Sequence, residues 1–102
     1  MNERGHLQAR LLSLPSDARE PALLAFLCAR TAAMLQLPAG SGVADTGFVA
    51  LGFDSLRAVE LRDELATAMA LELRSTLVFD HPTPRTLARH LLARLGADAE
   101  PQ

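Results

Sequence analysis

A serine that follows an aspartate at the start of a helical stretch is the residue best placed for chemistry in this sequence. Ser55 lies in the run LGFDSL at positions 51–56, where a glycine-bearing loop gives way to strong helical periodicity. A helix begins with unpaired backbone N–H groups and a partial positive charge, which stabilise a phosphate ester on its first residue. We therefore expect the Ser55 hydroxyl to be exposed and suited to carry a phosphate-linked group.

Two neighbouring residues are expected to set the geometry of this serine. Asp54 has a short carboxylate that can accept hydrogen bonds from the amides of the first turn, so we predict that it is the N-cap of the helix. Gly52 permits a backbone conformation with positive φ, which the turn into the helix requires. The predicted attachment site therefore consists of Gly52, Asp54 and Ser55.

Three stretches of the chain together resemble one known family. LGFDSL is followed by AVELR at positions 58–62 and by TLVFDHPTP at positions 76–84. In these motifs and their spacing the sequence resembles the acyl carrier protein domain of a type I modular polyketide synthase, over roughly residues 20 to 95. The resemblance implies that the phosphate of 4′-phosphopantetheine is esterified to Ser55 and that the terminal thiol of this arm holds the growing acyl chain as a thioester.

The resemblance also implies the partners of the chain. A phosphopantetheinyl transferase would attach the arm from CoA with the help of Mg²⁺. Ketosynthase, acyltransferase and other synthase domains would then act on the acyl thioester, while the carrier itself catalyses nothing and binds no metal of its own.

Other functions remain open from the residues alone. A peptidyl carrier domain of a non-ribosomal peptide synthetase or of a hybrid line is the first alternative, although its loading motif usually has a second glycine where this chain has Phe53. A serine hydrolase that uses Ser55, His81 and an aspartate is more remote, because no strand and no Gly-x-Ser-x-Gly turn surround the serine. An unmodified helical interaction module is the third alternative.

Composition agrees with a small module rather than a large enzyme. The 102 residues suffice for one domain, and a net charge of −2 offers no basic surface for nucleic acid. The single cysteine, Cys28, cannot form an internal disulfide, and we interpret it as a small buried hydrophobic residue. Neither a bilayer-spanning apolar run nor a signal-peptide core is present, so we expect a cytoplasmic protein without membrane contact.

The apolar periodicity predicts an all-α fold, and the resemblance implies a four-helix bundle with one short helix and a long first loop. We divide the chain into an N-terminal linker (1–16), a carrier domain (17–96) and a C-terminal tail (97–102), and we expect residues 7–14 to lie outside the core. The predicted helices run from about Ser16 to Gln36, from Ser55 to about Met69, and from Pro84, with Thr83 as its N-cap, to a stop at Gly96. Residues 76–79 alone have the pattern of a short strand, and the resemblance implies a short helical turn there instead. Within the loop at 38–53, a turn at 45–48 is expected to bury Phe48.

The helix that follows Ser55 is predicted to have two distinct faces. At 100° per residue, one arc must face the core, and it contains Ala58, Leu61, Leu65, Ala68 and Met69. The opposite face is expected to bind partner domains through a small apolar contact ringed by acids, formed by Leu56, Val59, Glu60 and Asp63. Arginines at positions 57 and 62 interrupt this acidic face, which weakens purely electrostatic docking.

The three histidines are not predicted to form an acid–base pair with the serine. His81 is typical of a turn residue in the run FDHPT, and His6 falls in the predicted linker. His90 lies mid-helix between arginines, where we expect exposure to solvent.

Overall fold

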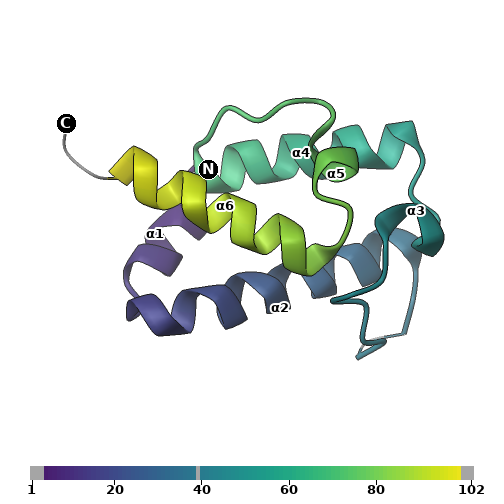
Figure 1. Ribbon diagram of the computed structural model, residues 1–102, viewed down its shortest axis with the longest axis horizontal. Helices are drawn as coiled ribbons and strands as arrows, with labels where there is room; N and C mark the ends of the chain where they lie inside the picture. The colour runs from purple at the N-terminus through teal and green to yellow at the C-terminus, as the bar shows by residue number, and fades with distance from the viewer. Residues whose placement is uncertain (1–3, 39, 100–102) are drawn as a thin grey trace.

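The computed structural model describes residues 4–38 and 40–99, and every regular element in this part of the chain is an α-helix. The helices are α1 (His6–Leu12), α2 (Ser16–Leu35), α3 (Phe48–Leu51), α4 (Ser55–Met69), α5 (Leu77–Asp80) and α6 (Pro84–Ala99). Figure 1 shows the three long helices α2, α4 and α6 running along the length of the bundle, with α1 at one end and α3 at the other. The predicted all-α bundle is confirmed, with α1 and α3 added to the four expected helices.

The predicted linker, loop and tail each include residues outside the described part of the chain. Residues 1–3, 39 and 100–102 lie outside the described residues.

One continuous hydrophobic core joins the long helices. Leucines at helical spacing project from α2, α4 and α6 into the same interior, because each helix has its apolar residues three or four positions apart. The fully buried leucines of these helices are Leu23, Leu27, Leu61, Leu65, Leu87, Leu91 and Leu95. With few aromatic side chains available, close packing of leucine and alanine forms most of this core.

The helix α2 ends in a left-handed turn rather than at the glycine-rich segment that follows it. Gln36 has φ 58°, its amide donates to the Ala33 carbonyl at 3.3 Å, and the Leu37 amide donates to the Ala32 carbonyl at 2.8 Å. These two bonds form a Schellman motif, which satisfies carbonyls left open at the helix end. The predicted extent of this helix is therefore confirmed to within one residue.

The expectation that residues 7–14 lie outside the core is wrong. Leu7 and Leu11 of α1 are 3% and 1% exposed and belong to the central cluster, and α1 contacts both α2 and α4. The Gly5 amide donates to the carbonyl of Thr67 at 2.7 Å, which ties the start of α1 to the end of α4. Burial of two leucines stabilises a helix too short to persist alone. Where the domain begins in its parent protein stays a prediction.

The final helix begins as predicted but ends later. The Thr83 hydroxyl accepts a hydrogen bond from the Thr86 amide at 3.1 Å, which makes Thr83 the N-cap, and Pro84 is the first helical residue. The predicted stop at Gly96 is wrong, because α6 continues through it to Ala99. Gly96 does not adopt the left-handed conformation of a helix-ending glycine, and a glycine inside a helix costs only about 1 kcal/mol.

The long connection between α2 and α4 is held by its second half. Phe48 is fully buried, as predicted, and its ring lies 5.0 Å from that of Phe53. The Phe48 amide donates to the Pro82 carbonyl at 2.8 Å, and Arg85 makes a two-pronged ion pair with Asp45 at 2.6 and 3.0 Å. The loop that leads to Ser55 is thereby attached to the start of α6.

A buried hydroxyl without a hydrogen-bond partner leads to a stability prediction. Thr31 of α2 is fully buried, and its Oγ1 makes no hydrogen bond to the described residues. Thr31→Val keeps the shape of the side chain and removes the unsatisfied group, so we expect an increase of about 1 kcal/mol in the free energy of unfolding, measured by urea denaturation. Thr31→Ser is the matched control: it keeps the hydroxyl, loses a methyl group and should destabilise the domain. A less stable Thr31→Val variant would contradict this account.

None of the described helices is both long enough and apolar enough to cross a lipid bilayer.

Candidate functional site

Ser55 is the first residue of α4 and is exposed to solvent. The residue before it has extended backbone angles, φ −108° and ψ −175°, and its carboxylate accepts a hydrogen bond from the Arg57 amide at 2.9 Å. The predicted N-cap at Asp54 is thus confirmed. The serine side chain therefore stands at a well-defined helix terminus with its hydroxyl accessible.

The charge of Asp54 is stabilised by the helix that it caps. The hydrogen bond from the Arg57 amide lowers the pKa of the Asp54 carboxyl, partial desolvation opposes this shift, and the Arg57 guanidinium lowers the pKa further. That guanidinium lies 3.4 Å from the second carboxylate oxygen. An ionised carboxylate therefore occupies donors at the start of α4, beside the Ser55 hydroxyl.

The turn into α4 depends on Gly52. This residue has φ 115°, as the sequence predicted, and its amide donates to the Val49 carbonyl at 3.1 Å at the end of α3. The Phe53 amide donates to the Phe48 carbonyl at 3.0 Å, and the Phe53 side chain is buried. A buried phenylalanine on one side and a capping aspartate on the other determine where the chain turns outward at Ser55.

The depressed pKa of Asp54 predicts a pH-dependent contribution to stability. The folded-state pKa lies below the ordinary value of 3.8, so the contribution of the charge is present above that value and is lost as pH falls through the folded-state pKa. Asp54→Asn keeps a cap without charge. We expect it to melt below wild type at pH 6 and to converge with wild type as the pH falls below 3.8, as measured by thermal circular dichroism.

Asp54→Ala is the control for this experiment. It removes the acceptor for the Arg57 amide altogether and should melt below Asp54→Asn at every pH. A constant difference between wild type and Asp54→Asn down to pH 2 would show that the charge contributes nothing.

The two faces of α4 lie as the helical periodicity predicted. Its buried residues are Ala58, Leu61, Leu65, Ala68 and Met69. On the opposite side Leu56 is 64% exposed, and Glu60 and Asp63 are also exposed. Val59 lies outside the buried arc but is half-buried rather than fully open.

The two arginines of this face are engaged with neighbouring groups. Arg57 pairs with Asp54, as described above. Arg62 is half-buried, donates to the Leu73 carbonyl at 3.0 Å and pairs with Asp63 at 2.8 Å. Its guanidinium holds the segment after α4 in place. Arg62 therefore interrupts the acidic character of the outer face of α4 less than the sequence suggested.

Besides Leu12 of α1, which is 40% exposed, two exposed apolar side chains were not singled out in the sequence. Val49 on α3 is 65% exposed and Phe79 on α5 is 47% exposed. Each lies on a four-residue helix, which is too short for a hydrophobic periodicity to show which side faces outward. Only the packing of these short helices against their neighbours identifies them as surface residues.

The expectation that His90 is exposed on α6 is wrong. Its ring is half-buried and stacks on the ring of His81, with centroids 3.8 Å apart and planes at 15°. His81 follows α5 directly and lies in a turn, as predicted. The connection between α5 and α6 brings together two rings that are nine positions apart.

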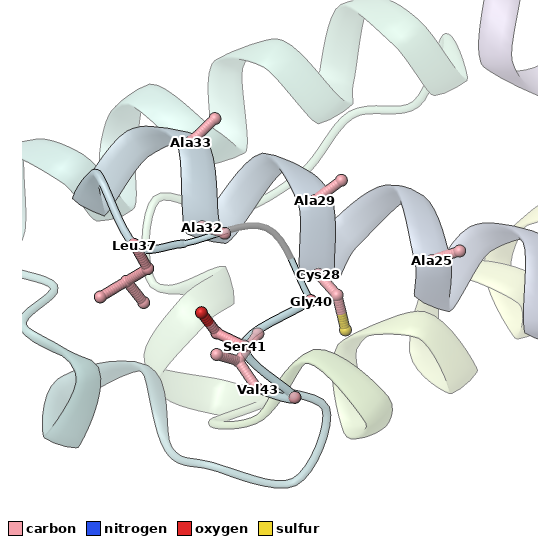
Figure 2. A pocket seen from close by; sticks show the side chains of 10 residues that line it. Ala25, Cys28, Ala29, Ala32, Ala33, Leu37, Gly40, Ser41 and Val43 are labelled. Atoms are coloured by element: carbon pink, nitrogen blue, oxygen red, sulfur yellow. The ribbon is translucent and has the colours of Figure 1, made fainter.

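An apolar hollow beside α2 does not include Ser55 in its lining. A cavity of about 440 Å³ separates α2 from the loop at 37–43. Figure 2 shows Cys28 of α2 directed toward the side on which Ser41 and Val43 lie. Burial raises the pKa of the Cys28 thiol, which Arg85 partly opposes. The thiol is half-buried and remains protonated at neutral pH, as expected for a small hydrophobic residue.

The arrangement of an exposed serine at the capped start of a helix, within a small helical bundle, matches one family. A family model described as the phosphopantetheine attachment site covers residues 25–91, more than half of the chain. The chain belongs to this family.

Related proteins narrow the class further. The chain is 46% identical over 102 residues to the spectinabilin polyketide synthase system protein NorC of Streptomyces orinoci. The alignment covers 98% of this chain and 4% of NorC. It is 46% identical over 94 residues to the pikromycin polyketide synthase component PikAIII of Streptomyces venezuelae. That alignment covers 91% of this chain and 6% of PikAIII. The chain thus spans only a small part of these relatives.

A solved structure agrees with these relatives. The A1-type ACP domain from module 5 of MLSA1 is 37% identical, with a TM-score of 0.75 and coverage of 91% of this chain and 94% of that one. The chain is therefore an acyl carrier domain of the polyketide synthase type, a non-catalytic carrier of phosphopantetheine.

Proposed function

We propose that Ser55 carries the 4′-phosphopantetheine arm and that the domain presents acyl groups on this arm to the catalytic domains of a polyketide synthase. The observation that carries the proposal is the position of Ser55, exposed at the first residue of α4 and next to the capping carboxylate of Asp54. When bound, the arm supplies a thiol that holds an acyl group as a thioester.

CoA is the donor of the phosphopantetheine group in the attachment reaction. A bond forms between Ser55 Oγ and the phosphorus next to the pantetheine, and the pyrophosphate bond of CoA breaks. Adenosine 3′,5′-bisphosphate leaves, and the hydroxyl proton passes to a base of the phosphopantetheinyl transferase. Mg²⁺ belongs to that transferase and neutralises the phosphates during transfer.

The residues around Ser55 are suited to hold the arm outward. Asp54 fixes the first turn of α4, and Gly52 directs the chain into it, so the Oγ atom does not depend on a flexible loop. The helix terminus contributes a favourable partial charge for the phosphodiester, although the Asp54 carboxylate already occupies the Arg57 amide. The positioning of the hydroxyl, more than donation to the phosphate, is what these residues provide.

The other serines lack this combination of features. Ser13 donates to the Arg10 carbonyl at 2.6 Å, and Ser41 donates to the Pro38 carbonyl. Ser75 lies in the turn before α5. Ser16 also begins a long helix, but the residue before it is proline and provides no side-chain cap.

The outer face of α4 is proposed to contact partner domains. Leu56 supplies an exposed apolar contact, Val59 continues it, and the carboxylates of Glu60 and Asp63 surround it. The proposed partners are the transferase, then ketosynthase, acyltransferase and other synthase domains. Each contact is expected to be small and brief, because one carrier serves several active sites.

We also propose that the chain works in the cytoplasm, since it has a single cysteine and its CoA-dependent loading requires no disulfide.

Mass spectrometry of the loaded chain tests the proposal. Incubation with CoA, Mg²⁺ and a broad-specificity transferase should add one phosphopantetheine per chain, and peptide fragmentation should locate it on Ser55. A chain that remains unmodified under conditions that load another carrier domain would favour the unmodified interaction module instead.

A further inference from the structure

Another hollow, of about 290 Å³ and lined mostly by polar side chains, lies between α5, α6 and the segment that follows α4. Its wall carries the basic side chains of Arg74, His81, His90 and Arg94, and one acid, Asp80. Neither Ser55 nor the outer face of α4 contributes to it. The hollow is therefore separate from the proposed attachment site and from the proposed partner surface.

Three elements bring these nitrogen-bearing side chains together. Arg74 comes from the segment before α5, His81 follows α5, and His90 and Arg94 are one turn apart on α6. The Asp80 carboxylate accepts a hydrogen bond from the Thr76 hydroxyl at 2.8 Å. The lining thus contains two arginines and one carboxylate, and the two imidazoles add further nitrogen atoms that can donate.

The stacked histidines indicate that the lining of this hollow disfavours additional positive charge. The two rings are nearly parallel and 3.8 Å apart, a distance at which two imidazolium charges repel each other. Burial lowers the pKa of His90 most, His81 and Arg94 lower it further, and Asp80 opposes them. An anion in the hollow would favour the protonated imidazole and reduce this repulsion.

We propose that the hollow formed by Arg74, His81, His90 and Arg94 binds a tetrahedral oxyanion of the phosphate class. Guanidinium groups donate through two parallel N–H bonds to phosphate oxygens, and they lie here with imidazoles that can share the remaining oxygens. The available volume accommodates one such group. The site does not depend on modification of Ser55.

Sulfate is the appropriate probe, because it remains a dianion over the pH range in which histidine titrates. The unmodified chain would be titrated by NMR, following the His81 and His90 ring protons in sodium sulfate and in sodium chloride at equal ionic strength. We expect sulfate to raise the pKa of His90 by about 0.5 unit or more, which corresponds to about threefold tighter binding to the protonated form.

Arginine variants separate a specific site from a general salt effect. The double variant Arg74→Gln/Arg94→Gln should lose the sulfate-dependent shift, and Arg74→Gln alone, at an exposed position, should reduce it without disturbing the packing. Arg89→Gln is the matched control: it removes the same charge from α6, at a residue that pairs with Glu20 and does not line the hollow. It should keep the full shift.

Two results would overturn the proposal. One is a His90 pKa that is the same in sulfate and chloride. The other is a sulfate-dependent shift of equal size in wild type and in the double variant, which would show that the arginines do not hold the anion.

Discussion

Ser55→Ala is expected to abolish phosphopantetheine attachment and leave the helical bundle intact. The substitution removes the only atom that forms the new bond to phosphorus. It leaves the helix cap unchanged, because the Asp54 carboxylate, and not the Ser55 hydroxyl, accepts from the Arg57 amide. Intact mass spectrometry should show no added arm, and circular dichroism should show an unaltered spectrum and melting temperature.

Ser16→Ala is the matched control for this result. Ser16, like Ser55, is an exposed first residue of a long helix, so the variant tests whether a helix start alone suffices for loading. We expect it to load like wild type. Attachment that persists in Ser55→Ala would refute the assignment of the site, whereas a Ser55→Ala chain that unfolds would refute the role given to Asp54.

Aspartate substitutions on the two faces of α4 should have opposite effects. Leu61 is fully buried, and Leu61→Asp removes a large apolar contact and introduces a carboxylate without a partner. The lost packing alone costs about 2–5 kcal/mol and the buried carboxylate several more, against a total stability of about 5–15 kcal/mol for a domain. We expect much of the Leu61→Asp population to be unfolded at 25 °C.

Val59→Asp should instead remain folded and impair contact with partners. The side chain lies outside the buried arc, so a loss of about 1 kcal/mol, or roughly 4–8 °C in melting temperature, is the expected cost. The new charge falls beside Leu56 in the proposed apolar contact. Loading by a transferase or acyl transfer by a cognate synthase domain should therefore slow markedly, measured as initial rates by mass spectrometry.

Ala93→Asp is the control for added charge, because it introduces the same group at an exposed position of α6. It should load and transfer at the wild-type rate. If Val59→Asp unfolds like Leu61→Asp, the outward assignment of Val59 is wrong. If Val59→Asp folds and transfers normally, the partner surface lies elsewhere, and the exposed side chains of Val49 and Phe79 are the next residues to test.

Local signals in the sequence were sufficient to predict α4 and its first turn. Asp54 caps through an atom three residues away in the chain, and Gly52 is the residue type that adopts φ 115° without strain. The buried arc of α4 follows from the 100° rotation per residue over fifteen residues, a span long enough for the periodicity to be unambiguous. These features need no knowledge of distant segments.

The incorrect predictions concern features that depend on partners far away in the sequence. Leu7 and Leu11 are buried because α2 and α4 cover them, and a seven-residue helix has too few positions to reveal this from its own pattern. His90 is half-buried because the turn after α5 brings His81 onto its ring. Gly96 could end a helix or continue one, and the local sequence does not decide between the two.

The attachment of the loop before Ser55 has a consequence for how much this segment can vary in length. From Ala44 onward the loop is joined to α6, since the Arg85 amide donates to the Ala44 carbonyl at 3.0 Å and the guanidinium holds Asp45. Near Gly40 and Gly42, by contrast, an added Cβ would meet nothing within 4 Å. Insertions near these exposed glycines lengthen a surface span, at about 0.6 kcal/mol for each doubling of its length. Insertions after Asp45 would displace the serine itself, so only the first half of the loop can accommodate changes in length.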